Sequence, residues 1–200
     1  MSKLLTTAAA IILVATPVFA DVVKDASKVE AGSYNVEPYH TRVLFSVDHM
    51  GFSSYYGEFT KATGSLVLDP AKPDASKLDV SVDATSISTP SDKLTGELKS
   101  EAWLDAGKFP AITFKSTKVT KIGAETAHVT GDLTIHGITK PVTLNVKFNG
   151  AGINPLDKKY TTGFEVSGKI KRSDFGVKTY VPLIGDEVNL IISGAFEKQG

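Results

Sequence analysis

Four histidines are the residues of this chain best suited to metal binding or acid–base chemistry, because its 200 residues include no cysteine. Ligands of one ion must converge, so metal-binding motifs keep their histidines close together on one element. His128 and His136 are eight residues apart, or about 26 Å along a strand at ~3.3 Å per residue. His40 and His49 are nine residues apart, and neither spacing matches a metal-binding motif. The sequence therefore predicts no metal site.

Motifs for covalent catalysis and for phosphate binding are missing from the sequence. The chain has no Gly-x-Ser-x-Gly nucleophile turn and no glycine-rich loop that leads into a helix. His49 is the one candidate general base, because it ends a predicted strand just before a loop rich in aromatic residues and glycine. The sequence favours a protein that is not an enzyme and needs no cofactor. An enzyme that acts on a hydrophobic substrate through His49 stays open as the alternative.

The charges of the chain exclude a further class of function. Basic and acidic residues number 22 each, so no basic footprint for a nucleic-acid backbone is present. No polybasic segment of the kind that binds anionic lipid headgroups occurs either. We therefore predict that nucleic acid is not a partner.

Aromatic side chains are frequent in the segments expected to connect strands. Phe52 and Tyr56 follow the first predicted strand, Trp103 follows a predicted helix, and Phe175 lies in a late loop. Such residues belong either to the core or to the apolar mouth of a cavity.

The late loop also contains Arg172, two residues before Asp174. This spacing around a turn predicts either a salt bridge that fixes the loop or a contact between Arg172 and the headgroup of a ligand. Both interpretations stay open from the sequence.

The first twenty residues have the pattern of a secretory signal peptide. Lys3 precedes an apolar run over 4–14, and small residues lead up to Ala20. The run is shorter than the ~20 residues that span a bilayer, and Pro17 interrupts it. We expect cleavage after Ala20, export to a bacterial periplasm and no membrane-spanning segment in the mature protein. Residues 21–33 are polar and aperiodic, which predicts a flexible leader.

From residue 34 onward, apolar residues alternate with polar ones, which is the pattern of half-buried strands. The exception is a segment from Ser91 to Asp105, where Leu94 and Leu98 recur at the spacing of a short amphipathic helix. The predicted strands fall at about 43–48, 66–68, 78–85, 112–115, 127–136, 142–149, 164–170 and 188–196.

About eight strands and one helix, without a break in composition, predict a single domain over residues 34–198. An antiparallel barrel is the favoured architecture, because closure removes the exposed edges of long apolar strands. Eight strands enclose enough space for one small elongated ligand. Glycines within the strands are typical of the bends in a barrel wall. A two-sheet sandwich is the alternative.

Four blocks of sequence stand out along the chain. They are His40-Thr41 with Phe45, His49 and Gly57-Glu58-Phe59, then 109–114, 131–142 and 172–176. In this order and spacing the blocks resemble the YceI-like family of periplasmic polyisoprenoid-binding proteins. The resemblance implies a lipocalin-like, eight-stranded antiparallel β-barrel with one short packed α-helix. It further implies an elongated apolar pocket that holds a polyprenyl chain, such as that of an isoprenoid quinone, or another long-chain lipid.

These observations predict a periplasmic binding or carrier protein for a long-chain lipid. The alternatives are the enzyme described above and an interaction module whose barrel is filled by its own side chains; a homodimer is also left open. A register error of one residue would exchange the predicted lining with the exterior. The predicted lining is Phe45, Val47, Phe59, Leu66, Val80, Val82, Phe114, Leu133, Val146, Phe164 and Leu190. The predicted mouth and headgroup contacts are His49, Phe52, Tyr56, Trp103, Arg172 and Phe175.

Overall fold

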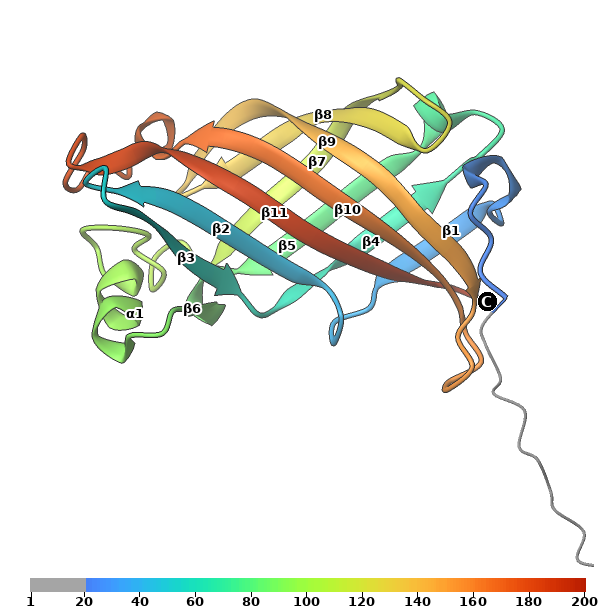
Figure 1. Cartoon of the computed structure of the whole chain (residues 1–200), viewed down its shortest axis with the longest axis horizontal. Helices are drawn as coiled ribbons and strands as arrows, with labels where there is room; N and C mark the ends of the chain where they lie inside the picture. Colours follow the sequence, from blue (N-terminus) through green and yellow to red (C-terminus); the bar gives the residue numbers. More distant parts are fainter. Residues whose placement is uncertain (1–20) are drawn as a thin grey trace, which may run out of the picture.

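The computed structural model describes residues 21–200, which fold into one antiparallel sheet closed on itself, with a single α-helix at one end of the barrel (Figure 1). The expected signal peptide, residues 1–20, lies outside this part of the chain. The helix is α1 (Asp92–Lys99), and short 3-10 turns occur at η1 (Ala26–Lys28), η2 (Pro73–Ala75), η3 (Ala84–Ser86) and η4 (Arg172–Phe175). The strands are β1 (Gly32–Val36), β2 (Arg42–His49), β3 (Ser53–Phe59), β4 (Ala62–Leu68), β5 (Lys77–Asp83), β6 (Ile87–Ser88), β7 (Ala111–Lys121), β8 (Thr126–Ile135), β9 (Ile138–Ile153), β10 (Tyr160–Lys171) and β11 (Ile184–Lys198).

Interrupted strands reduce the eleven strands to eight positions around the barrel. Both β1 and β2 pair with β11, with Val36 opposite Phe196 and Arg42 opposite Ser193. On the other side of these two strands, β1 pairs with β4 and β2 pairs with β3. In the next position, β5 pairs with β4 and β6 pairs with β3. The positions are therefore β1 with β2, β3 with β4, β5 with β6, and then β7 to β11. The predicted eight-stranded barrel is confirmed, and the sandwich alternative is wrong because β11 closes back onto β1.

Turn chemistry explains two of the tight hairpins. Met50 and Gly51 have φ values of 59° and 73°, and His136 and Gly137 have values of 52° and 75°. A turn with positive φ at both central positions matches the right-handed twist of the strands that it joins; His136 and Gly137 form the whole β8–β9 loop, whereas Phe52 adds a third residue to the β2–β3 loop. The first turn joins β2 to β3, and the second joins β8 to β9.

The connections divide between the two ends of the barrel (Figure 1). One end, called the α1 end below, carries α1, the β2–β3 and β8–β9 turns, and the β10–β11 connection. The opposite end, called the leader end, carries residues 21–31 and the β4–β5, β7–β8 and β9–β10 connections.

The segment expected to be a flexible leader packs against the barrel instead. The backbones of Val23 and Ala151 exchange hydrogen bonds of 2.7 and 2.9 Å. Val29 is buried against Phe148 and Ala151. Tyr34 is fully buried, and its hydroxyl donates to the carbonyl of Glu30 at 2.5 Å; burial raises the pKa of Tyr34. A few apolar side chains within a polar segment are thus enough to order it.

The predicted helix is present but shorter than expected. The Oγ of Ser91 accepts a hydrogen bond from the backbone of Leu94, which caps the start of α1. The helix ends at Lys99, because Ser100 turns out of it and donates to the carbonyl of Glu97. Residues beyond it form turns up to 108. Within residues 21–200 no helix has the length and hydropathy needed to cross a membrane.

Candidate functional site

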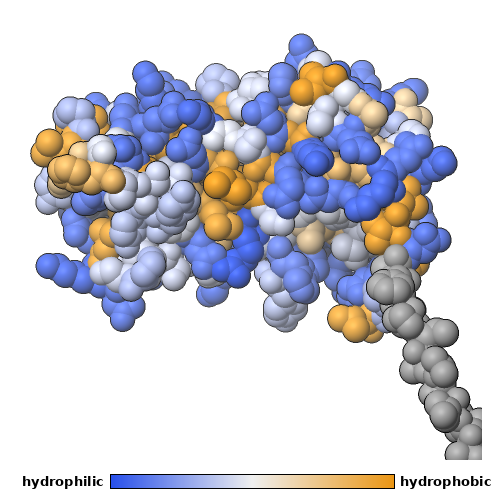
Figure 2. Space-filling view, viewed as in Figure 1, coloured by the Kyte–Doolittle hydropathy of each residue, from blue (hydrophilic) through white to orange (hydrophobic). Residues whose placement is uncertain are grey.

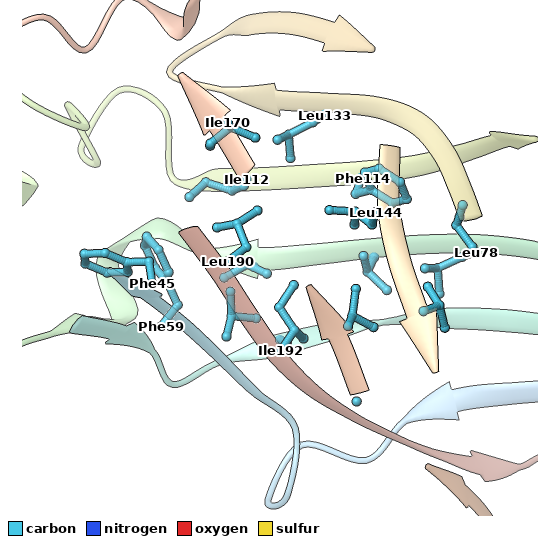
Figure 3. A pocket seen from close by; sticks show the side chains of 18 of the residues that line it. Phe45, Phe59, Leu78, Ile112, Phe114, Leu133, Leu144, Ile170, Leu190 and Ile192 are labelled. Atoms are coloured by element: carbon cyan, nitrogen blue, oxygen red, sulfur yellow. The ribbon is translucent and has the colours of Figure 1, made fainter. Parts of the chain in front are cut away.

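A cavity of about 770 Å³ extends through the interior of the barrel. Its wall includes residues from the leader end, such as Ala26 and Pro70, and from the α1 end, such as Trp103 and Tyr180. Pockets that bind small molecules commonly occupy ~300–1,000 Å³. Figure 3 shows apolar side chains from several strands, among them Phe45, Phe114 and Leu190, pointing into one shared space.

All eleven residues predicted to line the pocket are on the cavity wall. Phe45 and Phe59 contact each other with their ring centroids 5.8 Å apart. Gly57 lies beneath Phe45, and a Cβ at that position would come within 2.4 Å of the ring. Gly57 therefore allows Phe45 to lie flat on the wall. Their contact with a ligand stays a prediction.

The prediction missed several lining residues that share a strand face with the predicted ones. Strand residues two apart point to the same side of a sheet. The alternating pattern held this signal, because each missed residue lies two or four positions from a predicted one. These residues are Leu78, Ile112, Leu144, Ile170 and Ile192 (Figure 3).

Two of the predicted mouth residues, Phe52 and Tyr56, do not line the cavity. Tyr55 does so in place of Tyr56, because it lies opposite Val47, whose side chain faces inward. Tyr56 lies one residue further along β3 and is exposed on the outside of the barrel. Phe52 follows the β2–β3 turn and is 86% exposed. Tyr56 is predicted in a connecting segment, but it lies within β3, where the alternation of the strand turns its side chain outward.

His49 lines the cavity at the α1 end, where its ring centroid lies 6.5 Å from that of Tyr55. The neighbouring carboxylate of Asp48 accepts a hydrogen bond from the backbone of Gly51 at 2.7 Å. In the part of the chain that the structure describes, no carboxylate hydrogen-bonds the ring of His49. Nor do residues 21–200 contain a group of three or more His, Cys, Asp or Glu side chains placed to hold a metal ion.

Arg172 is buried at the same end, and its side chain holds the β10–β11 connection. Its Nε donates to the carbonyl of Gly185 at 2.9 Å, Nη1 to that of Val177 at 3.0 Å, and Nη2 to that of Ile184 at 2.8 Å. The ring of Trp103 lies over the guanidinium, with Cζ 5.2 Å from the ring centroid. Burial lowers the pKa of Arg172.

The predicted salt bridge between Arg172 and Asp174 is wrong. Asp174 is exposed, and Asp186 is the carboxylate that stabilises the loop. It accepts hydrogen bonds from the backbone and the hydroxyl of Ser173, at 2.9 and 2.7 Å. Burial raises the pKa of Asp186, but these hydrogen bonds and the charge of Arg172 outweigh burial and hold the pKa below its ordinary value. Asp186 is thirteen residues from Ser173 in the sequence, so no local spacing indicates this pair.

The segment that follows α1 covers the cavity from one side. Leu94 and Leu98 of α1 and the more buried Trp103 line the cavity, as the amphipathic spacing predicted. The hydroxyl of Thr179 donates to the carbonyl of Ala102, and the rings of Trp103 and Tyr180 are 6.1 Å apart. The helix itself has no buried residue. This cover is therefore attached to the β10–β11 connection at a few points. Phe175 is almost fully buried beneath this connection and also lines the cavity.

The barrel and its cavity have counterparts among known proteins. The sequence matches the YceI-like domain over residues 34–196. Protein YceI of Escherichia coli O6:H1 is 40% identical over 177 residues, which cover 88% of this chain and 92% of that protein. The crystal structure of BcnA from Burkholderia cenocepacia superposes with a TM-score of 0.73 at 26% identity, over 80% of this chain and 98% of BcnA.

A more distant structure shares the fold alone. A polyisoprenoid binding domain from Saccharophagus degradans superposes with a TM-score of 0.62 at 14% identity, over 85% of this chain and all of that domain. The match at the level of sequence extends from β1 to β11 and so includes the strands that enclose the cavity. On this basis the chain belongs to the YceI-like family.

Proposed function

We propose that this protein is a periplasmic binding or carrier protein for a long-chain lipid of the polyisoprenoid class, such as an isoprenoid quinone. The observation that carries the proposal is the continuous cavity of about 770 Å³, whose wall is built from apolar strand faces. Such a wall suits a hydrocarbon chain, since burying each methylene is worth ~0.8 kcal/mol. Ten buried carbons supply about 8 kcal/mol before the costs of association are subtracted.

The comparisons support the ligand class, because a polyisoprenoid binding domain shares the fold. The signal-peptide pattern of residues 1–20 supports export. The cavity argues against an interaction module with a filled barrel. Catalysis is not part of the proposal, since no hydrogen-bonded carboxylate orients His49 within residues 21–200.

The headgroup of the ligand is proposed to lie at the α1 end, beside His49. Arg172 also lines this end, but all three of its guanidinium nitrogens already donate to backbone carbonyls. Arg172 therefore shapes the site, whereas the ring of His49 is the better candidate for contact with a carbonyl or hydroxyl group of the ligand.

Organic extraction of the purified protein, followed by mass spectrometry, tests the function. We expect a long-chain isoprenoid lipid in the extract, and the protein should bind an added isoprenoid quinone. Leu190→Trp fills the cavity and should abolish both results. Ile191→Trp is the matched control, because Ile191 is the next residue of β11 and is exposed on the outside of the barrel. Equal lipid content in Leu190→Trp and Ile191→Trp contradicts the proposal. So does an unmodified protein that carries no lipid and binds no added quinone.

A further inference from the structure

Large apolar side chains are exposed around the α1 end of the barrel. Phe52 follows the β2–β3 turn and is 86% exposed, and Leu183, in the β10–β11 connection, is 63% exposed. Met50 and Tyr180, in the same two segments, are about half exposed. The backbone of Met50 donates to the carbonyl of Leu183 at 3.1 Å, so the two segments form one surface. These four residues are called the apolar rim. Figure 2 shows a group of hydrophobic residues at this end of the molecule, besides others over the middle of the barrel and at the leader end.

The apolar rim continues into the cavity. Met50, Tyr180 and Leu183 line the cavity and are exposed on the outside at the same time. The exposed apolar surface of the rim is therefore continuous with the cavity wall at this end, where His49, Glu97 and Arg172 also belong to the wall. At the leader end, the packed residues Ala26 and Val29 lie over the barrel. The exposed apolar side chain of Leu156 at that end is not part of the cavity wall, whereas three of the four rim residues are.

Charge is scarce in the rim. Residues 49–55 contain no acidic or basic side chain apart from His49, and residues 178–184 contain only Lys178. The β4–β5 connection at the opposite end, residues 69–76, contains three charged residues. An exposed apolar patch with a single positive charge is suited to insertion among lipids and to attraction by anionic headgroups.

We propose that the apolar rim docks the barrel onto the surface of a lipid bilayer, so that the ligand enters and leaves the cavity directly from the membrane. This inference rests on the proposed function, since a lipid ligand resides in a membrane before it is bound. A second copy of the chain is the competing occupant. It would bury the same side chains, but it would also cover the route into the cavity and leave Lys178 without an anionic partner.

Flotation with vesicles of phosphatidylethanolamine and phosphatidylglycerol tests the docking. The variant Phe52→Ser removes the most exposed rim side chain, which is not part of the cavity wall, so the fold and the cavity should be retained. We expect its vesicle affinity to fall about tenfold relative to the unmodified protein, because the most exposed apolar anchor is lost. Leu156→Ser is the matched control, since Leu156 is 91% exposed in the β9–β10 turn at the leader end. It should float like the unmodified protein.

Ligand binding without vesicles separates this inference from the proposed function. The rim variant should bind an added isoprenoid quinone in solution as the unmodified protein does, but extract it from vesicles more slowly. The docking is overturned if the unmodified protein does not bind vesicles. It is also overturned if Phe52→Ser and Leu156→Ser bind vesicles equally well. Both outcomes hold even when the quinone binds. A second copy occupies the rim if sedimentation shows a dimer that the rim substitution separates and the protein does not float with vesicles. That result also overturns the docking. Rim-dependent flotation without any quinone binding would support the docking and contradict the function.

Discussion

The two ends of the barrel are held by different forces. At the α1 end, one buried guanidinium and one carboxylate hold the β10–β11 connection by hydrogen bonds. At the leader end, Val29 packs among apolar side chains, and a backbone bridge from Val23 adds to this packing. Hydrogen bonds fix the geometry of a loop, whereas apolar packing covers surface without fixing a particular opening.

This difference suggests a division of roles. The α1 end combines a rigid connection with a lightly attached cover and an exposed apolar rim, so it is suited to ligand passage. The leader end is covered by the chain's own N-terminal segment, so it is suited to close the barrel. Substitutions at the two ends should therefore have effects that differ in size and in kind.

The largest effect is expected for Arg172→Leu. The substitution leaves the carbonyls of Val177, Ile184 and Gly185 without their donor inside the protein. We expect the free energy of unfolding to fall by about 3–5 kcal/mol, measured by denaturant titration. Lys171→Leu is the control; its exposed side chain predicts a change within about 0.5 kcal/mol. A loss below about 1 kcal/mol for Arg172→Leu would show that the connection is held by other contacts.

At the leader end, Val29→Ala should cost about 2 kcal/mol, because it removes buried methyl groups from an apolar cluster. Hydrogen exchange should show the effect as faster exchange of the amides of Val23 and Ala151. Lys28→Ala is the control, because Lys28 is exposed and makes only a surface ion pair of 3.9 Å with Asp25. Unchanged exchange in Val29→Ala would mean that the leader is not held by packing.

A smaller effect concerns the dependence of stability on pH. The pKa of Asp186 is lower in the folded protein than its ordinary value, so its stabilisation is present above the ordinary pKa and is lost as the pH falls through the folded pKa. Asp186→Asn should cost about 1 kcal/mol at neutral pH, since a charged acceptor is replaced, and less in acid. Unfolding titrations from neutral pH down to about pH 3 measure this.

Glu187→Gln serves as the control for the pH experiment. Glu187 pairs with Lys169 at 2.7 Å on the exposed barrel surface, where ion pairs contribute little. The pH profile of this variant should match that of the unmodified protein. A pH-independent cost of Asp186→Asn would contradict the assignment of a charged acceptor in the folded loop.

The smallest effect on stability is expected for the rim. Phe52→Ser should change the free energy of unfolding by less than about 0.5 kcal/mol, because the side chain is 86% exposed. Thermal and denaturant unfolding measure this, with Leu156→Ser as the matched control at the other end. A loss above about 1 kcal/mol would place Phe52 among the residues that stabilise the fold and would weaken the comparison between the ends.

Much of the barrel was predictable from local pattern. The alternation of apolar and polar residues placed Phe45, Phe114 and Leu190 on one wall, because strand residues two apart share a face. The same rule would have added Ile112 and Ile192. The rule fails where alternation is ambiguous: Tyr55 and Tyr56 are both aromatic, and only the pairing of Tyr55 with Val47 decides which one faces inward.

Local pattern was enough to predict the strand faces, a short helix, the absence of cysteine chemistry and the resemblance to a family. The closure of β11 onto β1, the ordering of the leader and the bonds from Arg172 to Ile184 and Gly185 emerge only in the folded chain. The physical reason is the range of the interactions. Alternation reports burial one strand at a time, whereas closure, leader packing and buried hydrogen bonds join residues that only the folded chain brings together.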